Sequence, residues 1–258
     1  MTSLTELQRK AADGESITLV NAYDFATAKL VDQSEVDIIL VGDSLGVTML
    51  GYPGTDRVTL DEIIHHASAV TRAVEDTFVM VDLPFGAYNV TPEEAVRNAN
   101  RLKKEGGADG IKLEGGQEVA EAVEAIDAAG ITVFGHMGVT PQTDDATDGY
   151  AVQGQTSTEA DELLEDARAV DEAGAVGMIL ELVDSEAAGT VTDATKGITI
   201  GIGAGPHCNA QAVTLHDLLG LYDVLPATAE GVSANFGGEI VEHLDSYDEA
   251  VDSGEFPQ

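Results

Sequence analysis

Positive charge is the scarcest property of this sequence. It has 12 Lys and Arg residues against 47 Asp and Glu residues, which gives a formal net charge of −35 at pH 7. Proteins bind nucleic acids and anionic membrane surfaces through clusters of cations. Twelve scattered cations cannot build such clusters, so we expect neither a nucleic-acid partner nor a membrane partner.

So large a net charge often accompanies disorder, but hydrophobic residues make up 43% of the chain. The acids are also spread among periodic apolar segments, so the chain is expected to fold. A dispersed acidic surface suits a protein that stays hydrated in concentrated salt, where ions screen the repulsion between like charges. This composition indicates a halophilic source.

Cysteine and long apolar stretches are scarce as well. The single Cys208 excludes an internal disulfide, which fits a reducing cytoplasm, and we interpret it as a small packing residue rather than a nucleophile. Residues 1–10 lack the apolar core of a signal peptide. No run of 18 apolar residues occurs. We therefore expect a cytoplasmic protein without a membrane-spanning helix.

Short apolar runs and segments with helical periodicity alternate along the chain. The predicted strands are 17–22, 36–41, 77–81, 110–113, 131–134, 176–180, 198–202 and 212–215. The predicted helices are 4–11, 25–33, 60–74, 91–105, 118–129, 158–173 and 237–251. This alternation predicts an α/β fold, a (β/α)8 TIM barrel with an N-terminal helix, as a single domain over residues 1–258. A doubly wound open sheet is the alternative.

Polar side chains stand at the ends of five of these strands. In a parallel barrel the carboxyl ends of all strands meet on one face, where active sites lie. A single acid after a strand is more often a helix cap or a turn residue, so the prediction rests on the whole set. The set consists of Asp43, Ser44, Asp82, Lys112, Glu114, His136 and Glu181.

Three of these residues, Lys112, Glu114 and Glu181, are charged side chains within or directly after apolar strands. Lys112 and Glu114 share one face of a strand, where the alternative to a functional role is a structural salt bridge. A buried ion pair adds little stability unless it is fully hydrogen-bonded. Glu181 ends a strand of aliphatic residues and loses hydration there, so we predict that it acts as a general base.

A metal site is predicted where the second, third and fourth strands end. Asp43 and Asp82 end neighbouring strands and can converge with Glu114. Three oxygen ligands with room for water and substrate suit Mg²⁺, whereas one histidine and one distant cysteine do not make a zinc site. His136 is predicted to donate a hydrogen bond beside the metal, with a capping or core histidine as the alternative.

Six segments together resemble those of ketopantoate hydroxymethyltransferases. They are residues 41–46, 82–85, 111–116, 135–142, 201–205 and 215–220, and the resemblance extends from about Ile17 to the C-terminal tail. It implies a barrel that moves a one-carbon unit from 5,10-methylenetetrahydrofolate to 3-methyl-2-oxobutanoate. The product would be 2-dehydropantoate, a precursor of pantothenate and coenzyme A, formed through an enolate that Mg²⁺ stabilises.

The resemblance also assigns roles to the strand-end residues and implies a homo-oligomer, with decamers known in the family. Asp43 and Asp82 would bind Mg²⁺ with Glu114 in or near its shell, Ser44 and Lys112 would hold the oxoacid beside Asp43, Asp82 and His136, and Glu181 would accept the proton. The partners expected are therefore the small oxoacid and a folate.

Three segments depart from the family pattern, and one of them, residues 206–211, differs from the acid- and Gly-containing family form. Family members carry Lys and Arg in the stretches that correspond to 149–155 and 226–236, where this chain has almost none. This departure leaves open whether the carrier is folate or a related archaeal pterin. Two other functions also stay open: a C–C lyase or phosphonomutase of the related Mg²⁺/enolate barrels, and a non-catalytic oligomeric barrel.

Overall fold

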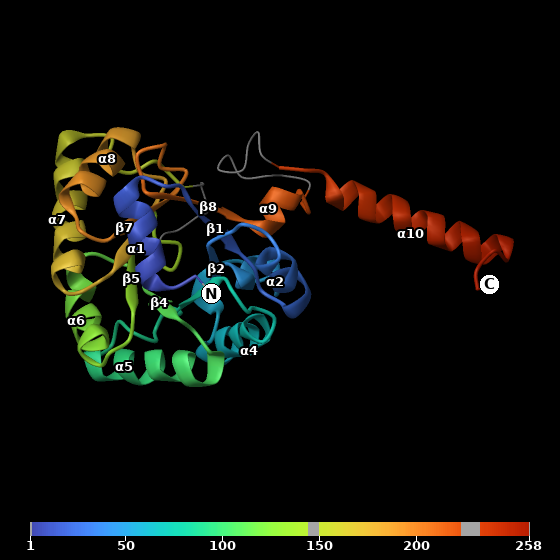
Figure 1. Ribbon diagram of the computed structural model, residues 1–258, viewed down its shortest axis with the longest axis horizontal. Coiled ribbons are helices and arrows are strands. Elements are labelled where there is room, and N and C mark those ends of the chain that lie inside the picture. Colours follow the sequence, from blue (N-terminus) through green and yellow to red (C-terminus); the bar gives the residue numbers. More distant parts are fainter. Residues whose placement is uncertain (1, 144–149, 223–232, 258) are drawn as a thin grey trace. The chain divides into compact units, whose positions relative to one another are not determined.

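The computed structural model describes residues 2–143, 150–222 and 233–257. Eight strands in these ranges form a closed parallel barrel and follow one another in chain order (Figure 1). The predicted barrel is confirmed and the open sheet is excluded. Of the cation-poor stretches, residues 149 and 226–232 lie outside the described residues. The strands are β1 (Ile17–Asn21), β2 (Ile38–Val41), β3 (Phe78–Asp82), β4 (Gly110–Lys112), β5 (Val133–Gly138), β6 (Gly177–Glu181), β7 (Ile198–Ile202) and β8 (Ala210–Thr214).

Helices α4 to α8 lie on the outside of these strands (Figure 1). Thr59 and Thr156 begin α4 and α7 with capping boxes, in which the threonine and a glutamate three residues later satisfy each other's backbone N–H groups. The α-helices are α1 (Leu4–Asp13), α2 (Phe25–Asp32), α3 (Leu45–Thr48), α4 (Leu60–Thr71), α5 (Pro92–Arg101), α6 (Ala120–Ala128), α7 (Ser157–Glu172), α8 (Ser185–Ala194), α9 (Leu215–Leu219) and α10 (Phe236–Ser253). Shorter helical turns are η1 (Thr55–Arg57), η2 (Leu102–Gly106) and η3 (Gln117–Val119).

The chain groups into two compact units, residues 1–212 and 213–258. The first contains β1 to β7 and α1 to α8, and the second contains α9 and α10. The boundary between the units falls within β8. The single domain over residues 1–258 stays a prediction. Within the described part of the chain, no helix combines the length and the hydropathy that a membrane span requires.

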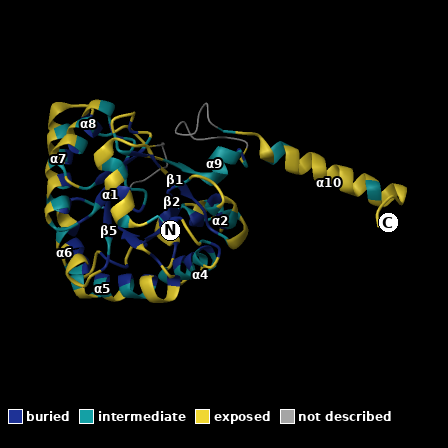
Figure 2. Ribbon diagram, in the orientation of Figure 1, coloured by how far each residue is buried: buried dark blue, intermediate teal, exposed yellow. Residues whose placement is uncertain are grey.

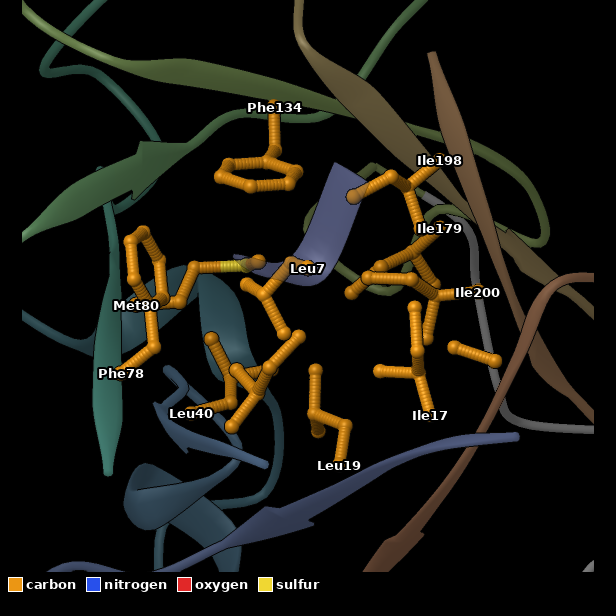
Figure 3. Packing of buried hydrophobic residues seen from close by; sticks show 12 residues of the cluster. Leu7, Ile17, Leu19, Leu40, Phe78, Met80, Phe134, Ile179, Ile198 and Ile200 are labelled. Carbon is orange, nitrogen blue, oxygen red and sulfur yellow. The ribbon is translucent and has the colours of Figure 1, made fainter. Parts of the chain in front are cut away.

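The core fills the inside of the barrel. Its side chains are buried while the outer faces of the helices are exposed (Figure 2). Leu7 of α1 is fully buried among strand side chains that include Met80 and Ile200, so the N-terminal helix closes one end of the barrel (Figure 3). Phe78 and Phe134 meet edge to face with ring centroids 6.1 Å apart. This apolar layer leaves the opposite end of the barrel for polar side chains.

A carboxylate outside the barrel fixes the start of β3. Asp32, at the end of α2, accepts hydrogen bonds from the backbone N–H groups of Glu75, Asp76 and Thr77 at 3.1, 3.0 and 3.1 Å. Burial alone would raise the pKa of Asp32, but these three donors outweigh it and lower the pKa. Asp32 is therefore held ionised at the point where the chain enters the third strand.

Candidate active site

Neighbouring strands bring the predicted residues to one end of the barrel. Asp43 follows β2 by two residues, and β2 pairs with β3, which ends at Asp82. Asp82 lies opposite Lys112 in the β3–β4 pairing, and Gly138 lies opposite Glu181 in the β5–β6 pairing. The carboxyl ends of five adjacent strands therefore supply the cluster.

Asp43 and Asp82 form a buried pair of carboxylates. The backbone N–H of Asp43 donates to Asp82 Oδ2 at 3.0 Å, whereas Asp82 Oδ1 is buried and has no hydrogen-bond partner. Burial raises the pKa of Asp43, and repulsion from Asp82 and Glu114 raises it further. The pKa of Asp82 is raised as well, mainly by burial and against the attraction of Lys112. For Asp82 the attraction of the nearby Lys112 does not outweigh burial, and Asp43 forms no ion pair within the described residues.

Lys112 is the cation at the centre of the cluster. Its Nζ lies 3.3 Å from Asp82 Oδ2, 3.4 Å from Glu114 Oε1 and 2.9 Å from His136 Nδ1. Burial would lower the pKa of Lys112, but the surrounding carboxylates outweigh it and raise the pKa. Lys112 is therefore a permanent positive charge, and its ion pairs and its hydrogen bond to His136 link β3, β4 and β5.

Glu114 is already engaged by three neighbours. Its Oε1 contacts Lys112 and lies 3.3 Å from His136 Nδ1, and its Oε2 accepts a hydrogen bond of 3.1 Å from the backbone N–H of Gln142. Burial would raise the pKa of Glu114, but Lys112 and His136 lower it to about 2. Among the described residues, no group of three His, Cys, Asp or Glu side chains is arranged to hold a metal ion. The three-carboxylate site stays a prediction, and its strongest members are Asp43 and Asp82.

His136 lies in β5 between the cluster and Glu181. Its Nε2 is 3.3 Å from Glu181 Oε2 but is buried and forms no hydrogen bond of good geometry. Burial and Lys112 lower the pKa of His136, but Glu114 and Glu181 raise it to about 9. If His136 is neutral, the Lys112 ammonium donates to Nδ1, and the ring hydrogen is on Nε2. If His136 is protonated, both ring nitrogens carry a hydrogen. In either state Nε2 carries a hydrogen and is a possible donor on the side of the site where Glu181 lies.

Glu181 is more accessible than the other predicted carboxylates, because 18% of its side chain is exposed. It is the last residue of β6, and the next residue, Leu182, has a φ of +48°. Such a backbone conformation is strained for a side chain of this size, and strain of this kind gathers at functional sites. Gly138 at the end of β5 also has a positive φ of +90°, which lets the ends of β5 and β6 approach closely.

Ser44 is held by two side chains that sequence reasoning did not select. Asn21 Nδ2 donates to Ser44 Oγ at 3.2 Å, and Tyr23 OH lies 2.8 Å from the same oxygen. Gly42 lies beneath them, because a Cβ there would lie 2.9 Å from the Asn21 amide and 3.3 Å from Asp82 Oδ2. Only glycine leaves room for this polar arrangement.

Gln142 is a further residue of the site that sequence reasoning did not assign. Its Nε2 donates to Asp43 Oδ2 at 2.6 Å and to the Leu83 carbonyl at 3.0 Å, and its Oε1 accepts from Tyr88 OH at 2.7 Å. Every polar group of this side chain is used inside the site. The one available signal was its position in the polar stretch after β5, which is part of the resembling segment 135–142.

Two cavities adjoin the cluster. One, of about 250 Å³, is lined by Glu114 and by the acids Glu118, Glu159, Glu162 and Asp166, which would repel an oxoacid. The other, of about 710 Å³, is lined by Gln142 together with Val47, Phe85 and Tyr150. The first cavity also contains the apolar Met137 and Leu163, and the second meets the cluster through Gln142.

The donor set fits a hard divalent cation. The hydrogen bond from Gln142 uses Oδ2 of Asp43, and Asp82 Oδ1 has no partner at all. Three buried carboxylates face Lys112 and His136, so with all three ionised the cluster carries an excess of negative charge even when the histidine is protonated. Carboxylate oxygens with an excess of negative charge are the ligands that Mg²⁺ prefers.

Solved structures with the same architecture include two barrel enzymes. A 2,3-dimethylmalate lyase, described as a member of the PEP mutase/isocitrate lyase superfamily, aligns with a TM-score of 0.60 and 18% identity over 100% of this chain and 90% of that chain. A phosphonopyruvate hydrolase in complex with oxalate and Mg²⁺ aligns with a TM-score of 0.64 and 12% identity over 98% of this chain and 88% of that chain. At these identities the likeness shows the fold alone.

Sequence comparison is more specific. Residues 1–258 match the sequence profile of the family described as ketopantoate hydroxymethyltransferase. The 3-methyl-2-oxobutanoate hydroxymethyltransferase of Ignicoccus hospitalis is 49% identical over 255 residues, which are 99% of this chain and 96% of that protein. The enzyme of the same name from Thermus thermophilus is 46% identical over 95% of this chain and 94% of its own length. The chain therefore belongs to the ketopantoate hydroxymethyltransferase family and is a transferase of hydroxymethyl groups.

Proposed function

We propose that the cluster catalyses transfer of a hydroxymethyl group from 5,10-methylenetetrahydrofolate, or a related pterin, to 3-methyl-2-oxobutanoate, with 2-dehydropantoate as the product. One observation carries this proposal. The buried Asp82 Oδ1 has no partner beside Asp43, and the permanent cation Lys112 lies 3.3 Å from the other oxygen of Asp82. Two buried acids with raised pKa values, next to a cation and a more accessible carboxylate, suit an oxoacid chelated to a metal ion.

Asp43 and Asp82 would hold Mg²⁺, with Glu114 close enough to raise the pKa of both. When bound, Mg²⁺ supplies Lewis acidity toward the keto and carboxylate oxygens of the oxoacid, which makes its C3–H bond more acidic. The protein groups then orient the oxoacid. Ser44 Oγ, held by Asn21 and Tyr23, is placed to bind its carboxylate.

Lys112 and His136 would stabilise negative charge on the oxoacid. Lys112 offsets the carboxylate charge, and the unpartnered Nε2–H of His136 is available to an oxygen as charge develops on it. Glu181 accepts the proton from C3, and C3 then forms a bond to the methylene carbon of the carrier. The methylene–nitrogen bonds of the carrier break and one water is consumed, so that the carbon arrives as a hydroxymethyl group and the reduced carrier leaves.

A lyase or phosphonomutase activity is less well supported. The likeness to such barrels shows only the fold, since the aligned identities are 12% and 18%. The two hydroxymethyltransferases described above are 49% and 46% identical over 99% and 95% of this chain. All seven strand-end residues are also present, which does not favour a non-catalytic barrel.

The two halves of the proposed reaction can be tested separately. With 3-methyl-2-oxobutanoate and Mg²⁺ in deuterated water, the protein should exchange the C3 proton without any carrier, as measured by NMR. The Glu181→Gln variant should bind the oxoacid but lose exchange, whereas Glu172→Gln, an exposed site at the end of α7, should behave as wild type. Retained exchange in Glu181→Gln would remove Glu181 as the base. If a folded wild-type sample forms no 2-dehydropantoate (ketopantoate) when the carrier is present, the proposed transfer is contradicted.

We also propose that the protein acts in the cytoplasm as a homo-oligomer, a decamer by family resemblance. The composition supports a salt requirement for assembly, because a net charge of −35 on each chain opposes association unless ions screen it. Light scattering of the full chain across a KCl series tests this. A monomer at every salt concentration would contradict the proposal.

A further inference from the structure

Leu182 has a backbone conformation that needs an explanation. Among the described residues it is the only one other than glycine with a positive φ, which is +48°. It directly follows Glu181, the carboxylate that we assign as the base. A leucine is sterically strained in this left-handed conformation, and a strained residue stays there only when the surrounding structure enforces it. The neighbours of Leu182 therefore have to supply that constraint.

The two peptide groups of Leu182 bond to different segments of the chain. Its N–H donates to the carbonyl of Ile202, the last residue of β7, at 2.8 Å, and its carbonyl accepts from the N–H of Gln153 at 2.8 Å. In a regular parallel strand, the N–H and C=O of one residue bond to the same neighbouring strand. The chain must therefore rotate at Leu182 to reach both partners, and the left-handed conformation provides this rotation.

Gln153 holds the chain on both sides of Val183. Besides donating to the Leu182 carbonyl, its main chain accepts from the N–H of Asp184 at 2.8 Å, so that Gln153 and Val183 form an isolated bridge. Val183 is only 2% exposed, so this bridge lies against the body of the barrel. We call these two main-chain hydrogen bonds the Gln153 clamp.

The direction of the Glu181 side chain depends on the main chain around it. Within the described residues its carboxylate forms no hydrogen bond of good geometry, although it lies 3.3 Å from His136 Nε2. The Glu181 carbonyl, in contrast, accepts from the N–H of Val139 at 2.9 Å. The backbone is thus fixed before Glu181 by β5 and after it by the clamp.

We propose that the Gln153 clamp positions the base: by holding Leu182 in the left-handed conformation, it directs the Glu181 carboxylate toward the oxoacid. Gln153 and Leu182 are then positioning residues that act through Glu181. The inference rests on the proposed function, because it takes Glu181 to be the proton acceptor. Gln153 lies in the cation-poor stretch 149–155, and a main-chain clamp does not need the basic side chains that the family carries there.

Proline at position 153 removes the N–H of the clamp. In Gln153→Pro the kcat for exchange of the C3 proton, measured by NMR with 3-methyl-2-oxobutanoate and Mg²⁺ in deuterated water, should fall by about 10- to 100-fold, because a reacting group displaced by up to about 1 Å loses that much. The KM for the oxoacid should stay within about twofold of wild type. Gln155→Pro is the matched control, since Gln155 is exposed and its N–H forms no hydrogen bond with the described residues. It should exchange as wild type does.

Asparagine at position 182 separates the conformation from the clamp that enforces it. Asn adopts a positive φ more readily than Leu, so Leu182→Asn should melt above wild type. Combined with Gln153→Pro, it should raise kcat by about tenfold over Gln153→Pro alone, because the left-handed conformation then depends less on the clamp. A merely structural role of Gln153 would give additive effects without this recovery.

Leu182→Val keeps the prediction testable even if Gln153→Pro does not fold. It leaves the clamp in place but introduces a β-branched residue, for which a positive φ is a steric outlier. Its kcat for exchange should be about tenfold or more below that of Leu182→Asn, again with the KM for the oxoacid little changed.

A wild-type kcat in Gln153→Pro would overturn the inference, and so would equal exchange by Leu182→Val and Leu182→Asn. Loss of exchange in Gln153→Pro without recovery in the double variant also contradicts it, because the loss then comes from general disruption of the segment. In each of these outcomes wild type still exchanges the C3 proton, so the proposed function stands. Folded wild-type protein that binds the oxoacid without exchanging the proton contradicts the proposed function, and the inference with it.

Discussion

The side-chain amide of Gln142 donates a hydrogen bond of 2.6 Å to the carboxylate of Asp43, 99 positions earlier in the chain. The same amide donates to the Leu83 carbonyl, and Tyr88 donates to its oxygen. Asp43 is thus oriented by the segment that follows β5. The position of this carboxylate depends on a residue that belongs neither to its own strand nor to the neighbouring one.

Replacing Gln142 by leucine keeps the volume of the side chain and removes its three hydrogen bonds. Because Asp43 Oδ2, the Leu83 carbonyl and Tyr88 OH then lose a buried partner, the free energy of unfolding should fall by about 1–3 kcal/mol. Product formation should fall with it. Denaturant unfolding and the ketopantoate assay measure the two effects. Gln211→Leu, an exposed glutamine with one hydrogen bond to the Gly205 carbonyl, serves as the control, and an equal loss there would contradict a special role for Gln142.

Asp43→Asn should separate stability from activity. Burial raises the pKa of Asp43, so the folded chain holds this proton more tightly than the unfolded chain. Ionisation of Asp43 therefore lowers stability as pH rises above the unfolded value, and the variant avoids this loss. In EDTA at pH 7 its melting temperature should exceed that of wild type by about 2–4 °C for each kcal/mol gained.

Addition of Mg²⁺ should then raise the melting temperature of wild type only, because the variant has lost a ligand. Product formation by Asp43→Asn should be lost. A variant that melts below wild type in EDTA, or that still responds to Mg²⁺ as wild type does, would be incompatible with a metal site at the Asp43–Asp82 pair.

Asp32→Asn tests the carboxylate that precedes β3. The pKa of Asp32 is lowered in the folded chain, because three backbone donors outweigh the effect of burial. Its contribution to stability is present above the unfolded pKa and is lost as pH falls through the folded value. The variant should lose about 1–3 kcal/mol at pH 7, and the difference from wild type should shrink at acidic pH. Urea unfolding at several pH values measures this, with the exposed Glu35→Gln as control.

Gly138→Ala probes the contact between the ends of β5 and β6. A Cβ at Gly138 would overlap the carbonyl oxygen of Glu181 and lie 2.6 Å from Val183 Cγ2, in a residue with a φ of +90°. Steric overlap and backbone strain together should cost about 2–4 kcal/mol. Gly130→Ala provides a matched control, since Gly130 has a φ of +74° but no atom within 4 Å of its Cβ position. The free energy of unfolding of Gly130→Ala should fall only by the cost of the backbone strain, about 1–2 kcal/mol. Equal losses in thermal melting would show that the overlap is relieved elsewhere.

The net charge of −35 predicts that salt stabilises the protein. Raising KCl to 1 M reduces the Debye length to about 3 Å, which screens repulsion among surface acids. The melting temperature should therefore rise steadily between low and molar KCl. Greater stability at low salt would contradict the halophilic interpretation of the composition.

The barrel was predictable because β-branched and aliphatic runs mark its strands clearly. Helix α8 was not predicted, since Gly189 and two threonines weaken the helical pattern. Its start depends on Asp184 accepting from the N–H groups of Glu186 and Ala187. Strand β5 begins two residues later than predicted and runs four residues further, which places His136 inside the strand.

The strand-end residues could also be identified from the sequence, because each polar side chain interrupts an apolar run. Gln142, Tyr88, Asn21 and Tyr23 could not, since their roles lie in hydrogen bonds to residues far away along the chain. Tyr88, for example, donates to Gln142 and accepts from the backbone N–H of Glu114. No local pattern marks such partners, so they became visible only once the strands were placed.

The cluster has a consequence for the order in which the barrel forms. Bringing Gln142 to Asp43 closes 99 residues of chain, at an entropic cost of about 4 kcal/mol from the length term alone. Parallel strand pairing over such separations is slow. We therefore expect Asp43 to stay hydrated until β5 and the segment after it dock. The carboxylate that Gln142 orients would then lose its water late in folding.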